Sequence, residues 1–298
     1  LENWLIDGSE LSAVIEEESS RRYIAMTCAT DDPEAEKAYL HFVENIQPRI
    51  KPLNDQLNRK LAESPHARDL DARRYGVLLR SVRNAIELFR EENVPLETEL
   101  DKLSQQYQKL QGAMTVPFQG KERTMQQMNV FLEENDRPVR QESWELTTQR
   151  RLQDAEAQDD IFDKMLALRT QIARNAGFDD FRAYQFRRYE RFDYTPDDCL
   201  HFHHAVEQLV VPVSRRATRE RRDAMNIESV RPWDMACDRY GRPPLKPFQT
   251  TVKLTQGCRA IFDRVDAQLG RQFQQMVDLG LLDLDSRKGK APGGYQTD

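Results

Sequence analysis

Apolar residues recur at every third or fourth position along most of the chain, the spacing that puts them on one face of an α-helix. Between Pro33 and Ser64 this stripe consists of Tyr39, Val43, Ile46, Ile50, Leu53, Leu57 and Leu61. Pro48 and Pro52 lie inside the stripe. Because each proline removes an amide donor and collides with the preceding turn, we expect a kink or a break within residues 47–52.

Similar stripes predict further helices over residues 75–89, 95–110, 121–135, 139–175, 195–224 and 254–279. Thr195 and Asp198 have the spacing of a capping box, and Gly177 and Gly280 are expected as left-handed residues that end helices. Leucine and aspartate alternate over residues 282–285, which predicts the beginning of a strand. The pattern therefore predicts a mostly α fold with a small β-sheet that starts near the C-terminus.

Breaks in the helical pattern indicate how the chain is organised. Residues 115–120 interrupt the helices and are expected to form a loop or a short extended piece. Residues 226–250 are rich in proline and predict an irregular connector. We therefore expect an N-terminal helical region over 1–115, a second helical region over 116–250, and a third part over 251–298 with a helix and the start of a sheet.

The composition narrows the class of protein. The 298 residues are 39% hydrophobic and 32% charged, which excludes a disordered or collagen-like chain. We expect no membrane partner, because no stretch is apolar enough for a membrane helix and no signal peptide is visible. The first residue is Leu1 and not methionine, so a chain that is cut or processed there is expected. The four cysteines form no CxxC pair, which predicts a reducing, cytoplasmic location.

The histidines form one cluster. His201, His203 and His204 lie on the helix predicted over 195–224, close to Glu207. Since residues three or four apart share a helix face, a metal half-site is one interpretation, and a helix with partly exposed, locally satisfied histidines is the other. The zinc-helix motif HExxH, the nucleophile elbow GxSxG and the Walker phosphate loop are all absent from the sequence.

Three basic segments each allow a binding and a structural interpretation. Lys288-Gly289-Lys290 is either a phosphate-binding loop or a simple turn. Segments 182–191 and 215–222 are rich in arginine, and the first interleaves arginine with aromatic residues, as in some proteins that bind single-stranded nucleic acid. The alternative is a solvated helix face with acids nearby. The net charge of −6 favours this alternative, so we expect no nucleic-acid partner.

Six segments are specific when they occur together and in order. They are RTQIARNAGF at 169–178, RFDYT at 191–195, VPV at 211–213, RPWD at 231–234, PLKPF at 244–248 and LDLDSRKGKAPGGY at 282–295. In this order they resemble the oligoendopeptidase F and thimet group of zinc metallopeptidases. The resemblance covers residues 169–295, and the helical character of the earlier part is compatible with it.

The resemblance implies a multi-helix shell that walls a deep peptide channel, together with the start of a small catalytic sheet. It also implies a zinc-dependent endopeptidase that hydrolyses short, unfolded peptides. In that family an HExxH helix follows the Gly-Gly-Tyr stretch and supplies zinc ligands and the general base. No HExxH occurs here, so no catalytic or metal-binding residue is carried over, and the chain is expected to be truncated and inactive as it stands.

One binding site can still be expected from the resemblance. Gly293, Gly294 and Tyr295 lie where a sheet edge could pair with the backbone of an extended peptide. The alternative function is a non-catalytic helical scaffold, or a peptide-binding or interaction protein that keeps the shell without its chemistry. Peptide preference and oligomeric state are not predicted.

Overall fold

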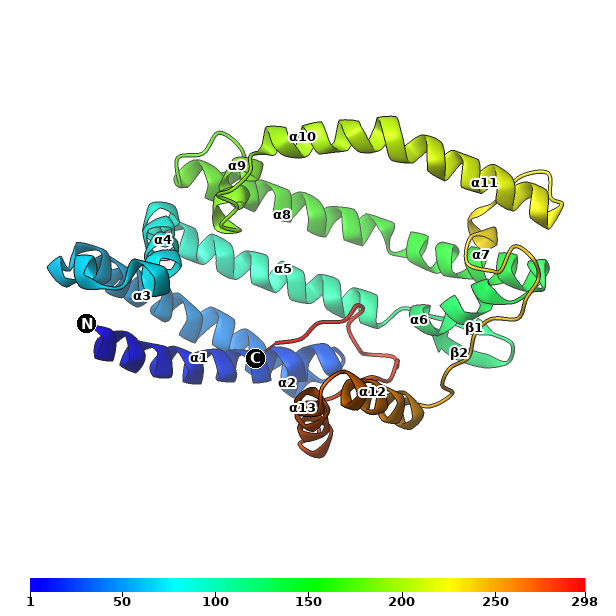
Figure 1. Ribbon diagram of the computed structural model, residues 1–298, viewed down its shortest axis with the longest axis horizontal. Coiled ribbons are helices and arrows are strands. Elements are labelled where there is room, and N and C mark those ends of the chain that lie inside the picture. The colour runs from blue at the N-terminus through cyan, green and yellow to red at the C-terminus, as the bar shows by residue number, and fades with distance from the viewer. Residues whose placement is uncertain (298) are drawn as a thin grey trace. The chain divides into compact units, whose positions relative to one another are not determined.

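Helices make up most of the computed structural model, which describes residues 1–297 (Figure 1). The α-helices are α1 Glu2–Cys28, α2 Pro33–His41, α3 Gln47–Glu63, α4 Ala72–Leu88, α5 Val94–Gly112, α6 Met125–Met128, α7 Arg137–Gln153, α8 Ala155–Asn175, α9 Phe181–Arg188, α10 Pro196–Ala205, α11 Val211–Met225, α12 Thr251–Val265 and α13 Ala267–Asp278. The shorter helical turns are η1 Phe42–Ile46, η2 Pro65–Asp69, η3 Glu91–Asn93, η4 Asn129–Glu133, η5 Val206–Val210 and η6 Pro232–Asp234. The strands are β1 Thr115–Phe118 and β2 Lys121–Thr124. The mostly helical fold class with a small sheet is confirmed.

The chain divides into two compact units, each assembled from segments that are apart in sequence. Unit 1 combines Leu1–Ala113, Gln153–Arg215 and the segment that begins at Ala291. Unit 2 combines Met114–Leu152 and Arg216–Lys290. The three-part domain division expected from the sequence stays a prediction.

Two π-helical turns show how the long helices accommodate proline. The turn η1 ends two residues before Pro48, and η5 ends two residues before Pro212. In η1 the amide of Gln47 donates to the carbonyl of Phe42, five residues earlier. This wider turn relieves the collision between a proline ring and the carbonyl four residues before it. The expected irregularity therefore lies just ahead of the prolines, and α3 continues through Pro52.

The small sheet is a β-hairpin in unit 2. Its strands pair antiparallel with Phe118 opposite Lys121, and Gln119 and Gly120 make the turn with φ values of 49° and 73°. Two positive φ values are typical of a type I′ turn, which suits the right-handed twist of paired strands. The extended piece expected near this position is confirmed. The helix expected to begin at Lys121 is wrong at its start, because β2 occupies these residues and α6 begins at Met125.

The last apolar stripe forms two helices where the sequence predicted one. Asp266 adopts an extended conformation between α12 and α13, and its side chain accepts a hydrogen bond from the amide of Gln268. This cap starts a new helix, so the stripe folds back on itself. The rings of Phe262 and Phe273 then pack between the two helices with centroids 5.1 Å apart. Gly280 ends α13 with a φ of 68°, as predicted.

The strand predicted at Leu282–Asp285 is wrong, since residues 281–287 have no regular secondary structure. A strand forms only beside a partner strand, and no other described segment pairs with this one. Side chains hold the segment instead. The Ser286 hydroxyl lies 2.8 Å from the Thr124 hydroxyl, and the Ser286 carbonyl accepts a hydrogen bond from Gln127 at 2.9 Å. The small sheet of the fold is therefore the β1–β2 hairpin and does not lie near the C-terminus.

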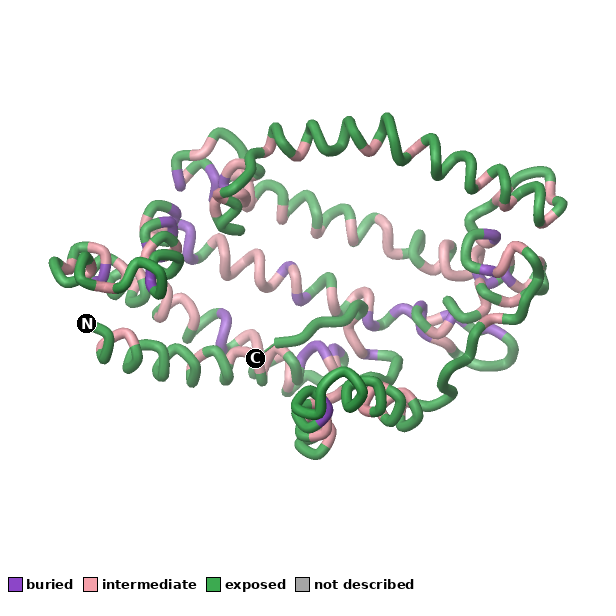
Figure 2. The backbone as a smooth tube through the Cα atoms, in the orientation of Figure 1, coloured by how far each residue is buried: buried purple, intermediate pink, exposed green. Residues whose placement is uncertain are grey.

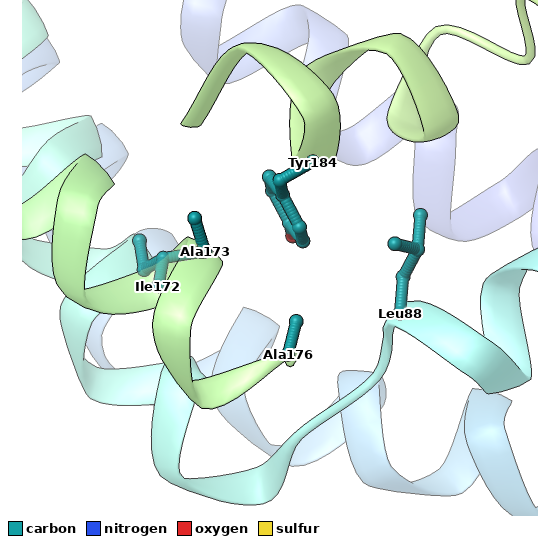
Figure 3. Packing of buried hydrophobic residues seen from close by; sticks show 5 residues of the cluster. All are labelled: Leu88, Ile172, Ala173, Ala176 and Tyr184. Atoms are coloured by element: carbon teal, nitrogen blue, oxygen red, sulfur yellow. The ribbon is translucent and has the colours of Figure 1, made fainter. Parts of the chain in front are cut away.

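A hydrophobic cluster in unit 1 joins α4, α8 and α9. Its buried members, labelled in Figure 3, are Leu88, Ile172, Ala173, Ala176 and Tyr184. Gly177 ends α8 with a φ of 85°, a conformation that favours glycine, and this confirms its predicted role. The reversal after Gly177 brings α9 back onto the cluster.

In unit 2 the Pro-rich connector is held by a buried carboxylate. Asp234 is completely buried and accepts hydrogen bonds from Arg137 at 3.0 and 2.9 Å and from Arg140 at 3.1 Å. The Arg231 amide adds a fourth at 2.9 Å. Burial alone raises the pKa of Asp234, but the hydrogen bonds from Arg137, the Arg231 amide and Arg140 outweigh it, so the pKa is lowered. Charge pairing thus fixes a segment that has little regular structure.

The chain exposes an unusually large area. Its accessible surface is 20,245 Å² at a mass of 34.9 kDa, whereas a compact protein of this mass exposes about 13,000 Å² and two compact units about 16,000 Å². Exposed residues dominate α1, α8 and α10 (Figure 2). Large apolar side chains are among them, such as Phe162 on α8 and Phe202 on α10. No helix within residues 1–297 combines the length and apolar character needed to cross a bilayer.

Candidate functional site

The Gly-Gly-Tyr segment, residues 293–295, is tied to the C-terminal part of α1 within unit 1 (Figure 1). The amide of Ala291 donates to the carbonyl of Thr27 at 2.8 Å. Further along, the hydroxyl of Tyr295 lies 2.5 Å from that of Thr27, and its ring packs on Tyr23 with centroids 5.4 Å apart. These contacts fix the segment at both ends while the ring of Tyr295 stays half exposed.

The two glycines of this segment offer open space and unpaired peptide groups. Gly293 has a φ of 97°, which favours glycine, and a Cβ added to either glycine would meet nothing within 4 Å. Among the described residues neither Gly293 nor Gly294 has a hydrogen-bond partner for its peptide group. An extended peptide could therefore bond to this backbone. The assignment of Gly293, Gly294 and Tyr295 as peptide-binding residues stays a prediction.

The basic loop just before this segment is a turn closed by its own charges. The ammonium group of Lys290 donates to the carbonyls of Asp283 and Asp285 at 2.8 and 3.0 Å, and to the Asp283 carboxylate at 3.0 Å. Lys288 pairs with Glu122 at 3.1 Å. Because both lysines contact acceptors of the chain itself, the arrangement favours the simple turn over a phosphate-binding loop.

The described residues do not fit a zinc ion. His204 lies 3.9 Å from Glu207, and both side chains are more than two-thirds exposed, at 71% and 73%. Within residues 1–297 no three His, Cys, Asp or Glu side chains come together as a set of metal ligands. A catalytic zinc requires three protein ligands. The histidine cluster therefore matches the interpretation of exposed side chains on a helix rather than that of a metal half-site.

The arginines of the two basic segments contact rings and carbonyls of the same unit. In the first segment Arg191 lies over the ring of Phe186 at 5.0 Å, and Arg187 lies over Phe192 at 5.3 Å. In the second, Arg221 donates to two carbonyl oxygens of the connector at 3.0 and 2.8 Å. These contacts favour a structural role for the arginines.

Sequence reasoning missed the residues that position the Gly-Gly-Tyr segment. Thr27 and Tyr23 lie more than 260 residues before Tyr295, and neither belongs to a motif. Their one signal is local. Tyr23, whose ring can stack, and Thr27, whose hydroxyl can form a hydrogen bond, lie four positions apart near the end of a polar helix. They therefore share one face of that helix.

Solved structures place the fold in a class. An oligoendopeptidase F from Bacillus anthracis strain Ames superposes with a TM-score of 0.87 and 25% identity, over 93% of this chain and 50% of that one. PZ peptidase A with an inhibitor gives a TM-score of 0.83 and 26% identity, over 92% and 48%. A second structure assigned as oligoendopeptidase F gives 0.84 and 26%, over 95% and 52%. The fold is that of the helical peptidases, and the chain spans about half the length of these relatives.

The family models identify the chain within this class. The model of Peptidase family M3 matches residues 130–298, which is more than half of the sequence. The model of the Peptidase M3 N-terminal domain matches residues 1–89. The chain belongs to peptidase family M3. No curated protein matches it.

Proposed function

We propose that residues 1–298 form the helical, peptide-binding part of a cytoplasmic zinc metalloendopeptidase that hydrolyses short, unfolded peptides. The observation that carries this proposal is the agreement of the fold with about half of oligoendopeptidase F. Zinc ligands and the general base come from residues outside 1–298 in this proposal, because the sequence holds no HExxH and the described residues hold no ligand cluster. By themselves, these residues bind peptides without cleaving them.

The exposed apolar surface supports a role as one wall of a channel. Phe162 and Leu166 on α8 are 56% and 48% exposed, and Phe202 on α10 and Leu209 in η5 are 67% and 70% exposed. Apolar side chains exposed in this number mark surfaces that another part covers. We propose that the catalytic part covers some of them, and that the remainder lines the space in which a peptide lies.

The Gly-Gly-Tyr segment is the proposed contact for the peptide backbone. Two adjacent peptide groups without partners can donate to and accept from an extended chain, as an edge strand does. Tyr295 holds this stretch against α1 through its hydroxyl and its ring. The segment therefore has its bonding groups ordered before a peptide arrives, which lowers the entropy cost of binding.

Replacing Tyr295 by alanine is expected to weaken binding of a fluorescein-labelled pentapeptide to residues 1–298 by about twofold to tenfold. The reason is the loss of an aromatic pair worth about 0.5–1.5 kcal/mol that orders the segment. Fluorescence anisotropy measures the dissociation constant. Tyr107→Ala on α5 is the matched control, since Tyr107 is comparably exposed at 42%.

A peptide with methylated backbone nitrogens tests the pairing itself. Methylation removes the donors that an edge strand would use, so the methylated pentapeptide should bind more weakly than the parent. Equal affinity of the two peptides, or a Tyr295→Ala variant that binds like the wild type, would contradict the assignment of this segment.

A further inference from the structure

Unit 1 contains a cavity whose wall is rich in hydrogen-bond acceptors. It has a volume of about 230 Å³ and lies among α1, α2, η1, α3 and α5. The lining residues are Ser19, Ser20, Tyr23, Tyr39, Val43, Gln47 and Asp101. None of them is a lysine or an arginine, and Asp101 is the one acid among them. Asp101 is thus the one lining residue that can supply a negative charge, and burial, opposed by the nearby Lys51, raises the pKa of its carboxyl group.

Two polar groups of this wall lack a hydrogen-bond donor within the part of the chain that the structure describes. The amide oxygen Oε1 of Gln47 is buried and has no partner. The carboxyl group of Asp101 makes no hydrogen bond, although nearby Lys51 could have supplied one. Lys51 instead pairs with Glu97 at 2.6 Å. Leaving a buried acceptor without a donor costs free energy. A ligand that brings a hydrogen-bond donor to this part of the wall would therefore be stabilised.

Two aromatic rings complete the cavity. The rings of Tyr23 and Tyr39 lie with centroids 5.9 Å apart and an interplanar angle of 55°. Burial, followed by the nearby Asp101, raises the pKa of the Tyr39 hydroxyl, which is therefore neutral and can accept a hydrogen bond. Rings beside a carboxylate form the usual environment for an organic cation, because the ring faces carry negative potential.

We propose that this cavity binds a primary ammonium group, with Asp101 as its counter-ion and Tyr23 and Tyr39 along its side. An ammonium group has three donors, and Asp101, the Gln47 oxygen and the Tyr39 hydroxyl are the acceptors available in the wall. A divalent metal fits less well, since calcium and magnesium sites use several oxygen ligands with more carboxylate charge. The proposal does not depend on peptidase activity.

The position of the cavity suggests two sources of the ammonium group. The Ser20 hydroxyl at its wall lies 3.1 Å from the hydroxyl of Thr297, and Tyr23 carries the ring of Tyr295. The cavity therefore adjoins the Gly-Gly-Tyr segment within unit 1. The ammonium group is either the amino terminus of a peptide or a free alkylamine.

Isothermal titration calorimetry of residues 1–298 tests the proposal with three probes at constant pH. They are n-butylamine, alanyl-alanine amide with a free amino terminus, and the same dipeptide amide acetylated at that terminus. Saturable binding of either ammonium probe, with no binding of the acetylated one, is expected. Preference for the dipeptide identifies a peptide amino terminus as the ligand, and preference for butylamine identifies a free amine.

Variants locate the site. Asp101→Asn keeps the shape and removes the charge, and it should weaken binding by at least about tenfold. Tyr39→Phe keeps the ring and removes one acceptor, so a loss of about threefold is expected. Glu99→Gln is the control on the same helix, because Glu99 pairs with Lys102 at 3.2 Å and is not in the cavity wall. Absence of binding by both ammonium probes, or equal binding by Asp101→Asn and wild type, would overturn the proposal.

Discussion

Replacing Asp234 by asparagine is expected to lower the free energy of unfolding of unit 2 by about 3–5 kcal/mol, the cost of leaving a buried charge without its partner. Arg140 has a side chain only 3% exposed and loses its counter-ion in this variant. Tryptophan fluorescence during urea unfolding measures the change. Trp144 and Trp233 both belong to unit 2, and their ring centroids lie 5.3 Å apart. Asp223→Asn is the control, since Asp223 is exposed and pairs with Arg222 on the surface.

The effect of Asp234 also has a definite pH dependence. Its pKa is lowered in the folded chain from an ordinary value of 3.8, so its stabilising contribution is present above 3.8 and is lost as the pH falls through the lowered value. The gap in stability between wild type and Asp234→Asn should accordingly stay constant near neutral pH and shrink below pH 3.8. A gap that is absent at pH 7, or one that grows on acidification, would contradict the role of this carboxylate.

Replacing Ile172 by alanine is expected to destabilise unit 1 by about 2–5 kcal/mol, because it removes buried methyl groups and leaves a cavity. Ile172 is 1% exposed and belongs to the buried cluster that also contains Leu88 and Tyr184 (Figure 3). Hydrogen exchange of α8 measured by mass spectrometry, together with thermal unfolding followed by circular dichroism, gives the change. Leu166→Ala on the same helix is the matched control. Leu166 is 48% exposed, so a shift within about 0.5 kcal/mol is expected there.

An Ile172→Ala variant as stable as Leu166→Ala would contradict the assignment of this cluster as the core of unit 1. The backbone adds a further check. The buried side chain of Asn93 donates to the carbonyl of Ile172 at 3.1 Å, and the substitution leaves this bond in place. A loss of stability in Ile172→Ala therefore reports packing and not a broken hydrogen bond.

Local rules predicted much of the helical fold. The capping box of α10 is present, with Thr195 and Asp198 exchanging both hydrogen bonds, and Gly177 and Gly280 take the left-handed conformations expected of them. Each of these features depends on residues within one turn of one another. Such interactions are readable from spacing alone.

Features that depend on a partner far away in the sequence could not be predicted from local spacing. The alternation of Leu282 and Asp283 satisfies a strand pattern, but a ladder needs a second strand, and none pairs with this segment in residues 1–297. The break at Asp266 was hidden because the apolar stripe continues across it in sequence. In both segments the spacing of apolar residues indicated which face of the element is apolar. It did not indicate where the backbone changes direction or whether a partner strand is present.

In the candidate site, too, the residues of a local motif were predicted and those that depend on distant parts of the chain were not. The resemblance identified the Gly-Gly-Tyr segment from a contiguous motif. It did not identify Thr27 or Asp101, which meet their surroundings only after the chain has folded over long sequence distances. Asp234 was quoted within a motif without an indication that it would be buried between two arginines.

The most direct test of the proposed function measures bound zinc, peptide binding and peptide hydrolysis on one preparation of residues 1–298. Zinc is added in slight excess and removed by gel filtration, bound metal is counted by mass spectrometry, and cleavage of a quenched fluorescent pentapeptide is followed at concentrations where anisotropy shows binding. We expect saturable peptide binding, zinc well below one ion per chain, and no cleavage. One zinc ion per chain with cleavage that a chelator abolishes, or a chain that binds no peptide at all, would contradict the proposed function.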